Sequence, residues 1–301
     1  MADTLIVIAG PTAVGKSDVA LHVAEALSCE IISADSRQVY QEMRIGTAAP
    51  SDADLSRVPH HLVRCRSVLS PLNAYDFEQE VLQILPGAFK RGGGVAVLAG
   101  GSMMYVDALC RGIDPMPDVP PILREQLKAE LEQCGLPHMV SRLQDLDPDY
   151  CRHADLHNPR RVLHALELCI VSGKPVSRLR TGLPKSRPFR IIKFAISRPR
   201  PELYDRIDAR VDQMVADGLI PEAQSLVHLS HLPALQTVGY RELFSHFRGG
   251  LQLPEAISLI KRNTRHYAKK QITWLNADPD YISLPATSAL PAILNALSTA
   301  E

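Results

Sequence analysis

Hydrophobic positions in the first hundred residues alternate between short runs and helical spacings. The segments 5–9, 30–34 and 95–99 are mostly apolar and short, which is typical of buried strands. Between the first two, the apolar positions of 19–27 recur at helical intervals. Strands that alternate with helices predict an α/β fold in which a parallel sheet is covered by helices on both faces.

The pattern changes after residue 113. Prolines cluster at 115–121 and predict a stiff connector. Beyond it the spacing is helical: apolar residues share one face over 123–131, and Pro159 begins a helix that ends at Gly173. We therefore expect an inserted helical domain at 114–188.

A second α/β pattern follows the insertion. The segment 190–196 predicts a strand that returns to the sheet, and helices are expected at about 201–217 and 254–275. The sequence thus predicts a catalytic core made of 1–113 and 189–301. The tail after Pro285 shows no informative pattern.

Composition narrows the class of protein. With 301 residues, 46% of them hydrophobic, the chain can bury a large core. No stretch of about 18 apolar residues is present, so no membrane span is expected. The chain begins with a strand and without signal-peptide features, which predicts a cytoplasmic protein. Six scattered cysteines without a C-x-x-C pair predict reduced, mostly buried thiols and no zinc site.

The net charge of zero conceals an asymmetry. Residues 1–60 carry eight acidic and four basic side chains, whereas 152–193 carry ten basic and two acidic ones. A further basic cluster lies on the helix expected at 254–275. Each cluster alone is equally consistent with a solvated surface, but two of them on a neutral protein favour a polyanionic partner such as nucleic acid.

A phosphate-binding loop is the most specific motif. Residues 10–17 match G-x-x-x-x-G-K-[ST], directly after a predicted strand and before a predicted helix. Backbone amides and the helix start attract an anion, and a lysine adds a full charge. The motif predicts binding of a di- or triphosphate, with a hydroxyl available to Mg²⁺. Its residues are Gly10, Pro11, Thr12, Ala13, Val14, Gly15, Lys16 and Ser17.

Polar residues also follow the other two predicted strands. Asp35 ends the second strand and Gly100-Gly101-Ser102 follows the third. In open α/β sheets ligands bind at this carboxyl edge. A carboxylate here binds magnesium, orients a hydroxyl, or accepts a proton from an amine. The alternative is that Asp35 caps a helix N-terminus.

Taken together, these motifs resemble the tRNA dimethylallyltransferases (isopentenyl-diphosphate:tRNA transferases), over almost the full chain. The resemblance rests on the order and spacing of 10–17, 35–40, 46–48, 100–105, 158–162, 238–242 and 264–274. It implies a P-loop NTPase-like sheet with an inserted domain that grips the anticodon stem-loop. It also implies transfer of a dimethylallyl group from dimethylallyl diphosphate to N6 of the adenosine 3′ of the anticodon, in tRNAs that read codons beginning with U.

The resemblance also implies roles for individual residues. Asp35 is expected to be the general base, with Ser102 and Lys16 as further catalytic residues. Arg124 is expected to contact the diphosphate or the nucleic acid, and Ser17 to hold Mg²⁺. The expected tRNA contacts are Asp35, Ser36, Arg37, Gln38, Ser102, Arg124, Arg160, Arg161, Val162, Leu163, His164, Gln236, Thr237, Val238, Gly239, Tyr240, Arg241, Lys269, Lys270, Gln271, Thr273 and Trp274.

Several positions depart from the family pattern or admit a simpler role. Val14, Ser17, Ser102 and the pair 103–104 differ from the residues usual in the family, which puts the shape of the prenyl pocket in doubt. Arg161 and Lys270 also fit exposed helix charges, and Trp274 fits a core position.

Two other functions share parts of the pattern. A small-molecule or nucleoside kinase explains the loop and Asp35 but not the basic clusters. A nucleic-acid-binding P-loop protein explains the charge but gives Asp35 and Ser102 no task. The resemblance implies tRNA and dimethylallyl diphosphate as partners; no membrane is expected, and the protein is expected to be a monomer.

Overall fold

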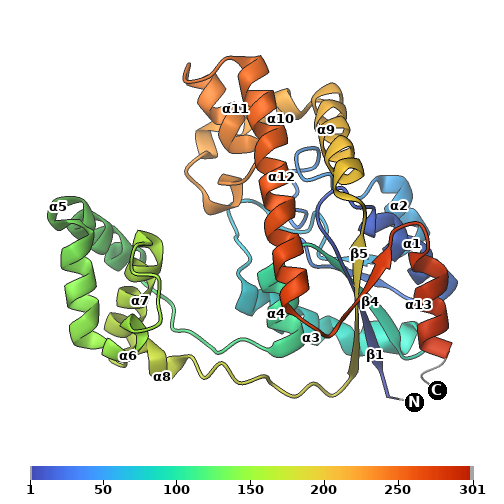
Figure 1. Ribbon diagram of the computed structural model, residues 1–301, viewed down its shortest axis with the longest axis horizontal. Helices are drawn as coiled ribbons and strands as arrows, with labels where there is room; N and C mark the ends of the chain where they lie inside the picture. Colours follow the sequence, from blue (N-terminus) through green and yellow to red (C-terminus); the bar gives the residue numbers. More distant parts are fainter. Residues whose placement is uncertain (1, 299–301) are drawn as a thin grey trace. The chain divides into compact units, whose positions relative to one another are not determined.

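A computed structural model describes residues 2–298 and shows two compact units (Figure 1). One unit includes the chain up to Cys110 and again from Ser186, and the other runs from Arg111 to Lys185. The insertion expected at 114–188 thus overlaps the second unit, whose limits lie three residues earlier at each end.

The return to the first unit at 186 has a physical cause. Arg187 donates hydrogen bonds to the carbonyls of Ala108 and Leu109 and forms a buried ion pair with Glu78. Because these partners all belong to the first unit, residues 186–188 pack with it and not with the inserted helices.

A six-stranded sheet forms the centre of the first unit. Its strand order is β3-β2-β4-β1-β5-β6, and every neighbouring pair is parallel. The α/β P-loop-like fold is therefore confirmed. The strands are β1 (Thr4–Ala9), β2 (Ile31–Ser33), β3 (His60–His61), β4 (Val95–Gly100), β5 (Arg190–Ser197) and β6 (Tyr281–Pro285).

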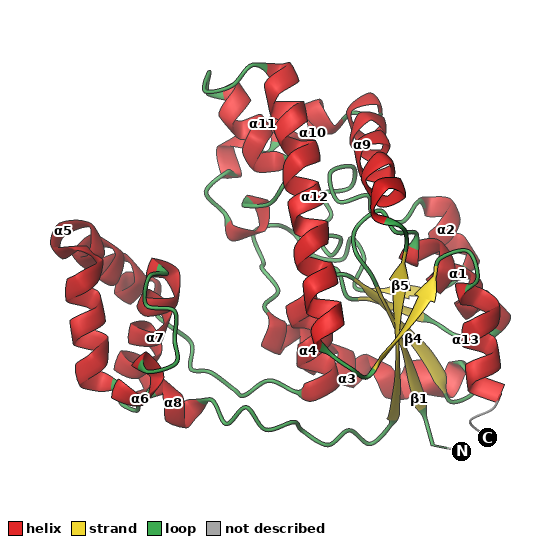
Figure 2. Ribbon diagram, in the orientation of Figure 1, coloured by secondary structure: helices red, strands yellow, loops and turns green. Residues whose placement is uncertain are grey.

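Helices cover both faces of the sheet (Figure 2). Alternate residues of a strand point to opposite faces, and β1 shows this clearly. Leu5 and Val7 join a core with α3, α4 and α12, whereas Ile6 and Ile8 join a second core with α1, α9 and α13. The helices of this unit are α1 (Lys16–Ala26), α2 (Asp52–Arg57), α3 (Ala74–Arg91), α4 (Met103–Arg111), α9 (Arg200–Ala216), α10 (Leu219–Ser225), α11 (Tyr240–Phe247), α12 (Leu253–Ala277) and α13 (Ala289–Ser298), with 3-10 turns η1 (Val227–Leu229) and η2 (Pro233–Leu235).

The second unit is entirely helical. It contains α5 (Pro121–Leu146), α6 (Pro148–Cys151), α7 (Pro159–Ser172) and α8 (Val176–Leu179). Helix α5 contains a break at Gly135, whose φ of +80° and ψ of 168° are not helical. The predicted helix from Pro159 to Gly173 is confirmed, since Gly173 ends α7 with a φ of +65°.

Some sequence predictions were wrong or incomplete. Strands β3 and β6 and helix α13 carried too little periodic signal to be predicted. The expectation of mostly buried cysteines was also wrong: Cys29 and Cys169 are buried, whereas Cys65 and Cys134 are exposed. Among the described residues, no helix combines the length and apolarity that a membrane span needs.

Candidate functional site

The phosphate loop connects β1 directly to α1. Ala13 and Gly15 have positive φ values of +64° and +98°, which place both residues in the left-handed region. Such a turn directs successive N–H groups toward one point, where an anion binds. Gly15 caps α1, and Lys16 is the first residue of that helix. The loop thus combines a helix N-terminus with a lysine, as the motif predicted.

Two arginines hold the back of this loop. Nε of Arg198 donates to the carbonyl of Val14 at 2.7 Å, and Nε of Arg206 donates to the carbonyl of Ala13 at 2.9 Å. Both carbonyls are thereby turned toward the arginines. The loop is fixed from its carbonyl side by residues that come more than 180 positions later in the chain.

Asp35 and Ser102 lie at the carboxyl ends of the neighbouring strands β2 and β4. Oδ1 of Asp35 accepts the N–H groups of Arg37 at 2.9 Å and of Gln38 at 3.3 Å. No helix begins at Asp35, so the alternative of a helix N-cap is wrong; the carboxylate instead holds a turn. Within the described residues, no hydrogen bond engages Oδ2, so this oxygen is available to a ligand.

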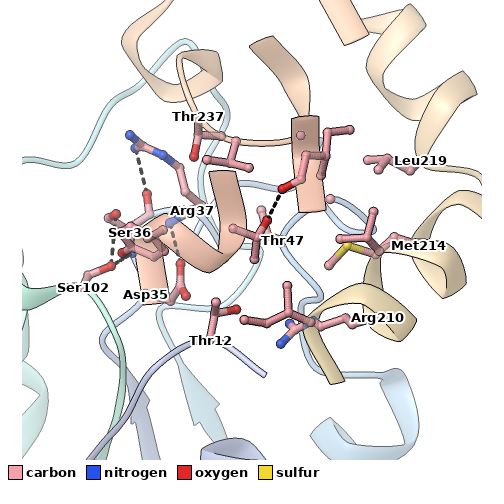
Figure 3. Close-up of a pocket in the computed structure, with 18 residues that line it drawn as sticks. Thr12, Asp35, Ser36, Arg37, Thr47, Ser102, Arg210, Met214, Leu219 and Thr237 are labelled. Carbon is pink, nitrogen blue, oxygen red and sulfur yellow. Dashed lines mark hydrogen bonds between the residues drawn. The ribbon is translucent and has the colours of Figure 1, made fainter. Parts of the chain in front are cut away.

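Ser102 is nearly buried and faces the same turn. Its Oγ accepts the N–H of Ser36 at 2.8 Å and donates to Oγ of Ser36 at 3.1 Å. The serine hydroxyl and the Asp35 carboxylate are thus held by one short segment of backbone (Figure 3). The ends of two strands bring together residues that are 67 positions apart in sequence.

Positive charge concentrates beside Asp35. Burial and the nearby Arg210 lower the pKa of Lys16 to about 8, although the Asp35 carboxylate opposes the shift. Burial also lowers the pKa of Arg210, again against the effect of Asp35. Two cations beside one carboxylate form a site with excess positive charge, which an anionic ligand relieves.

A pocket of about 210 Å³ opens beside these groups and has two chemically different sides. Asp35, Ser36 and Ser102 lie on one side, whereas Met214 and Leu219 lie on the opposite side (Figure 3). The apolar side comes from α9, α10 and α12. The lining residues are Thr12, Asp35, Ser36, Arg37, Gly46, Thr47, Ser102, Ile207, Arg210, Val211, Met214, Leu219, Thr237, Val238, Gly239, Ile260, Thr264 and Tyr267.

A larger cavity of about 640 Å³ lies over the phosphate loop. Ala13, Gly15, Lys16 and Ser17 line it, together with Arg210. Arg210 also lines the two-sided pocket, so the two cavities adjoin at this residue.

The turn at 45–47 closes the two-sided pocket. Glu222 accepts the N–H groups of Ile45 at 2.7 Å and Gly46 at 2.8 Å, and also the hydroxyl of Tyr240 at 2.7 Å. This carboxylate joins two of the motifs that carried the family resemblance. Burial and Glu222 raise the pKa of Tyr240, so its hydroxyl stays protonated.

The structure places the predicted tRNA contacts of the first unit in three environments. Arg37, Thr237, Val238 and Gly239 line the pocket, and Arg241, Lys269, Lys270 and Thr273 are exposed. In contrast, Tyr240 and Gln271 are buried and hydrogen-bonded within the protein. Their side chains face the interior of the protein, so RNA contact by Tyr240 and Gln271 stays an untested prediction.

Three further side chains of this group are engaged within the protein. Gln38 donates from Nε2 to the carbonyls of Thr47 and Ala48, and Gln236 donates to the carbonyl of Ser230. Trp274 is partly buried against the core, and its indole N–H bonds to Asp107 at 2.9 Å. The core position considered for Trp274 is thus the one that the structure shows.

The remaining predicted contacts lie in the helical unit. Arg160 and Arg161 are exposed at the N-terminus of α7, and no ion pair engages them among the described residues. His164 and Arg124 are also exposed, each near Glu167, and Leu163 is partly buried. The side chain of Val162 is buried in the core of this unit, and its predicted contact with tRNA stays untested.

Part of the basic character noted in the sequence is structural. Arg187 and Lys193 form buried ion pairs with Glu78 and with Asp278, respectively. On α12, Lys261 pairs with Asp212 and Arg265 with Asp208, which leaves the exposed Arg262, Lys269 and Lys270 for other contacts.

Sequence reasoning missed Arg210, Glu222 and the apolar wall. Arg206 and Arg210 recur four residues apart on the helix that follows β5, so both face the phosphate loop. This spacing was the available signal. Glu222 gave none, because its partners are 176 to 177 residues earlier and 18 residues later in the chain.

Comparisons with known proteins give consistent results. Residues 38–278 match the family described as IPP transferase. The chain is 49% identical to tRNA dimethylallyltransferase 1 of Bacteroides thetaiotaomicron, over 92% of this chain and 90% of the relative. It is 45% identical to tRNA dimethylallyltransferase 2 of Parabacteroides distasonis, over 92% of this chain and 93% of the relative.

Solved structures agree with this similarity. The full-length tRNA isopentenylpyrophosphate transferase of Bacillus halodurans superimposes with a TM-score of 0.73 at 31% identity, covering 99% of this chain and 96% of that one. A eukaryotic dimethylallyltransferase acting on tRNA has a TM-score of 0.79 at 23% identity, covering 95% and 74%. At this lower identity the likeness supports the fold alone.

Proposed function

The chain belongs to the IPP transferase family, and on that premise we propose that it transfers a dimethylallyl group from dimethylallyl diphosphate to tRNA. The acceptor is N6 of the adenosine 3′ of the anticodon, in tRNAs that read codons beginning with U. The products are N6-(dimethylallyl)adenosine and diphosphate.

One observation supports this proposal: the cavity over the phosphate loop and the pocket with a carboxylate and an apolar wall lie side by side and share Arg210. Dimethylallyl diphosphate has the same division, with a charged head and a short apolar chain. The phosphate loop, Lys16 and Arg210 suit the head. Met214 and Leu219 suit the five-carbon chain. If the protein were a kinase, its polar phosphate-accepting substrate would not need that apolar wall.

The leaving group sets the first requirement of the reaction. As the bond between the allylic carbon and the diphosphate oxygen breaks, negative charge grows on the diphosphate. Ala13, Gly15, Lys16 and Arg210 line the cavity in which the diphosphate would lie, so their amides and charges would stabilise the transition state. The apolar wall keeps water away from the allylic carbon, which carries positive character as the bond lengthens.

The acceptor amine sets the second requirement. The lone pair of N6 is delocalised into the adenine ring, so the amine is a weak nucleophile. Asp35 accepts a proton from N6 through Oδ2 as the new C–N bond forms. Ser102, held by Ser36, orients the same amine. The proton moves to Asp35, and the electron pair of the broken bond leaves with the diphosphate.

A magnesium ion fits this site. Ser17 and Asp35 line the same small cavity of about 30 Å³ beside the phosphate loop. The described residues contain no cluster of three or more His, Cys, Asp or Glu side chains suited to a metal. Mg²⁺ needs no such cluster, since it commonly binds one or two protein oxygens together with substrate phosphates. When bound, it would neutralise charge on the diphosphate.

RNA binding is assigned to exposed basic residues. Arg160, Arg161 and Arg124 of the helical unit and Lys269 and Lys270 of α12 are exposed and suit phosphate contacts. The pocket-lining segment 237–239 would contact the adenosine that enters the pocket. We further propose that the protein acts as a cytoplasmic monomer.

Product mapping tests this proposal. Unmodified tRNA is incubated with enzyme and dimethylallyl diphosphate, digested to nucleosides, and analysed by mass spectrometry after site-specific nuclease cleavage. The proposal requires one dimethylallyl group on N6 of the adenosine 3′ of the anticodon. A prenyl group at another nucleotide, or no prenylated nucleoside, would refute it.

A further inference from the structure

Gln271 bridges the two loops of the active site. It lies on α12, and its side chain is 2% exposed. Oε1 accepts the N–H of Thr12 at 2.9 Å, and Nε2 donates to the carbonyl of Gly101 at 2.8 Å. Thr12 belongs to the phosphate loop, and Gly101 directly precedes Ser102. One carboxamide therefore joins the donor cradle to the acceptor loop.

We propose that Gln271 is a positioning residue for group transfer. It fixes the distance between the phosphate loop and Ser102, so that the allylic carbon and the amine meet at bonding distance. This inference rests on the proposed function, because it concerns how the two substrates are placed relative to each other. Gln271 touches neither of them and acts through Thr12 and Gly101.

The chemistry of the bridge requires a carboxamide. Thr12 offers a donor and Gly101 offers an acceptor, so the linking group must accept on one side and donate on the other. Glutamate keeps the acceptor but loses the donor, and methionine loses both. Either change leaves the carbonyl of Gly101 with only the longer hydrogen bond from Tyr267, and methionine also leaves the N–H of Thr12 without its partner, which is unfavourable for a buried group.

The contact between Gln271 and the Gly101 carbonyl depends on the absence of a side chain at Gly101. A Cβ atom at Gly101 would lie 2.3 Å from Nε2 of Gln271, which is too close for any non-bonded pair. Only glycine at 101 allows the carboxamide to reach the carbonyl. Tyr267, one helical turn earlier on α12, donates to the same carbonyl at 3.4 Å. The Gly100–Ser102 loop is thus fixed from one face of α12.

This arrangement predicts a kinetic effect that differs from simple destabilisation. Misplacing reacting groups by about 1 Å costs up to about 100-fold in rate. Q271M is therefore expected to lower kcat by about 10- to 100-fold, with the KM for tRNA unchanged within about twofold. Q271E is expected to lower kcat and also to weaken diphosphate binding, because it adds a negative charge beside the loop.

A second variant reaches the same bridge from the other side. G101A displaces the carboxamide without altering Gln271, and its Cβ atom would also lie 3.1 Å from the carbonyl oxygen of Gly10. If both substitutions act on one bridge, the double variant Q271M/G101A loses about as much kcat as either single variant. Additive losses would show that the two residues act separately and would overturn the inference.

The test measures kcat, both KM values, the Kd for pyrophosphate and the thermal midpoint. N73A is the matched control, because it also removes a side-chain amide partner: Asn73 accepts the N–H of Asp76 at 2.9 Å and lines none of the cavities. N73A is expected to lower the thermal midpoint and leave kcat within twofold. If folded Q271M also keeps its kcat within twofold of the wild type, the inference is overturned.

Other outcomes are equally decisive. A raised KM for tRNA with unchanged kcat and pyrophosphate binding would make Gln271 an RNA contact and would overturn positioning. If Q271M does not fold, G101A and Q271E decide. If the wild-type enzyme transfers no prenyl group, the proposed function fails. Comparing the Kd for pyrophosphate between wild type and Q271M then still shows whether the bridge positions the phosphate loop, and equal values would overturn that role.

Discussion

Tyr240 donates its hydroxyl hydrogen to Glu222 at 2.7 Å, and the same carboxylate accepts the N–H groups of Ile45 and Gly46. Three donors from two distant segments thus converge on one side chain. Gly46 has no space for a side chain, because a Cβ atom there would lie 2.6 Å from the tyrosine oxygen. The turn that closes the pocket is built on this contact.

Removing Glu222 should loosen the turn at 45–47. E222A leaves three donors without their acceptor, and each unpaired buried group costs about 1–3 kcal/mol. We expect a loss of about 3 kcal/mol in the free energy of unfolding, measured by urea denaturation. Y240F removes one donor and should lose only about 1 kcal/mol. Equal losses in the two variants would show that Glu222 does not hold the turn.

Lys16 should make donor binding depend on pH. Its pKa of about 8 in the free protein means that the lysine loses its charge well below the usual pH of about 10.5. A bound diphosphate favours the charged form and raises this pKa. Affinity is therefore full below pH 8 and falls by up to tenfold per pH unit above it.

Calorimetry with an unreactive dimethylallyl thiolodiphosphate measures this effect. Between pH 7.5 and 9.5 the affinity of the wild type should fall by about 20-fold. K16R keeps its charge over this range, so its profile should be flat. A flat profile in the wild type would mean that Lys16 stays charged in the free protein.

Asp35 should matter for chemistry far more than for binding. D35N keeps the hydrogen bonds to the turn through its amide oxygen but cannot take the proton from N6. We expect the rate constant measured in single-turnover assays to fall by about 10²- to 10⁴-fold. The Kd for tRNA should change less than about threefold. Full activity of D35N would remove Asp35 from the proton transfer.

Met214 should define the apolar end of the pocket. A larger side chain there competes with the prenyl chain for the same space, while the phosphate loop is untouched. M214W should raise the KM for dimethylallyl diphosphate by at least about tenfold, since each buried methylene contributes about 0.8 kcal/mol. The Kd for pyrophosphate should stay within about twofold. An equal effect on both ligands would show that the prenyl chain binds elsewhere.

Arg160 and Arg161 should contact RNA phosphates. They are exposed at the start of α7 and carry no ion pair among the described residues. Each lost phosphate contact reduces the slope of log K against log salt by about 0.7 to 0.9. The double variant R160A/R161A should therefore weaken anticodon stem-loop binding and reduce this slope by about 1.5. An unchanged slope would show that both arginines are ordinary solvated charges.

The phosphate loop and its two neighbours were predictable because their signals are local. A motif of eight residues lies between a strand and a helix, and Asp35 and Ser102 follow strands of the same sheet. Parallel strands end at one edge, so sequence order alone placed these residues together. The order of the strands, with β1 between β4 and β5, needed the structure.

The apolar wall and the bridging residues were not predictable in the same way. Met214, Glu222 and Gln271 act on partners that lie far away in sequence, and their own segments look like ordinary amphipathic helices. Their role depends on which face of a helix meets which loop. Tyr240 and Gln271 show the difference most clearly, since their motifs suggested surface contacts and packing made them internal.

The most direct test supplies both candidate donors at once. Enzyme and unmodified tRNA are incubated with dimethylallyl diphosphate labelled in the prenyl group and with ATP labelled in the γ-phosphate. We expect prenyl label in tRNA, one equivalent per tRNA molecule, and no transferred phosphate in any product. Phosphate transfer or ATP hydrolysis without prenyl label in tRNA would contradict the proposed function.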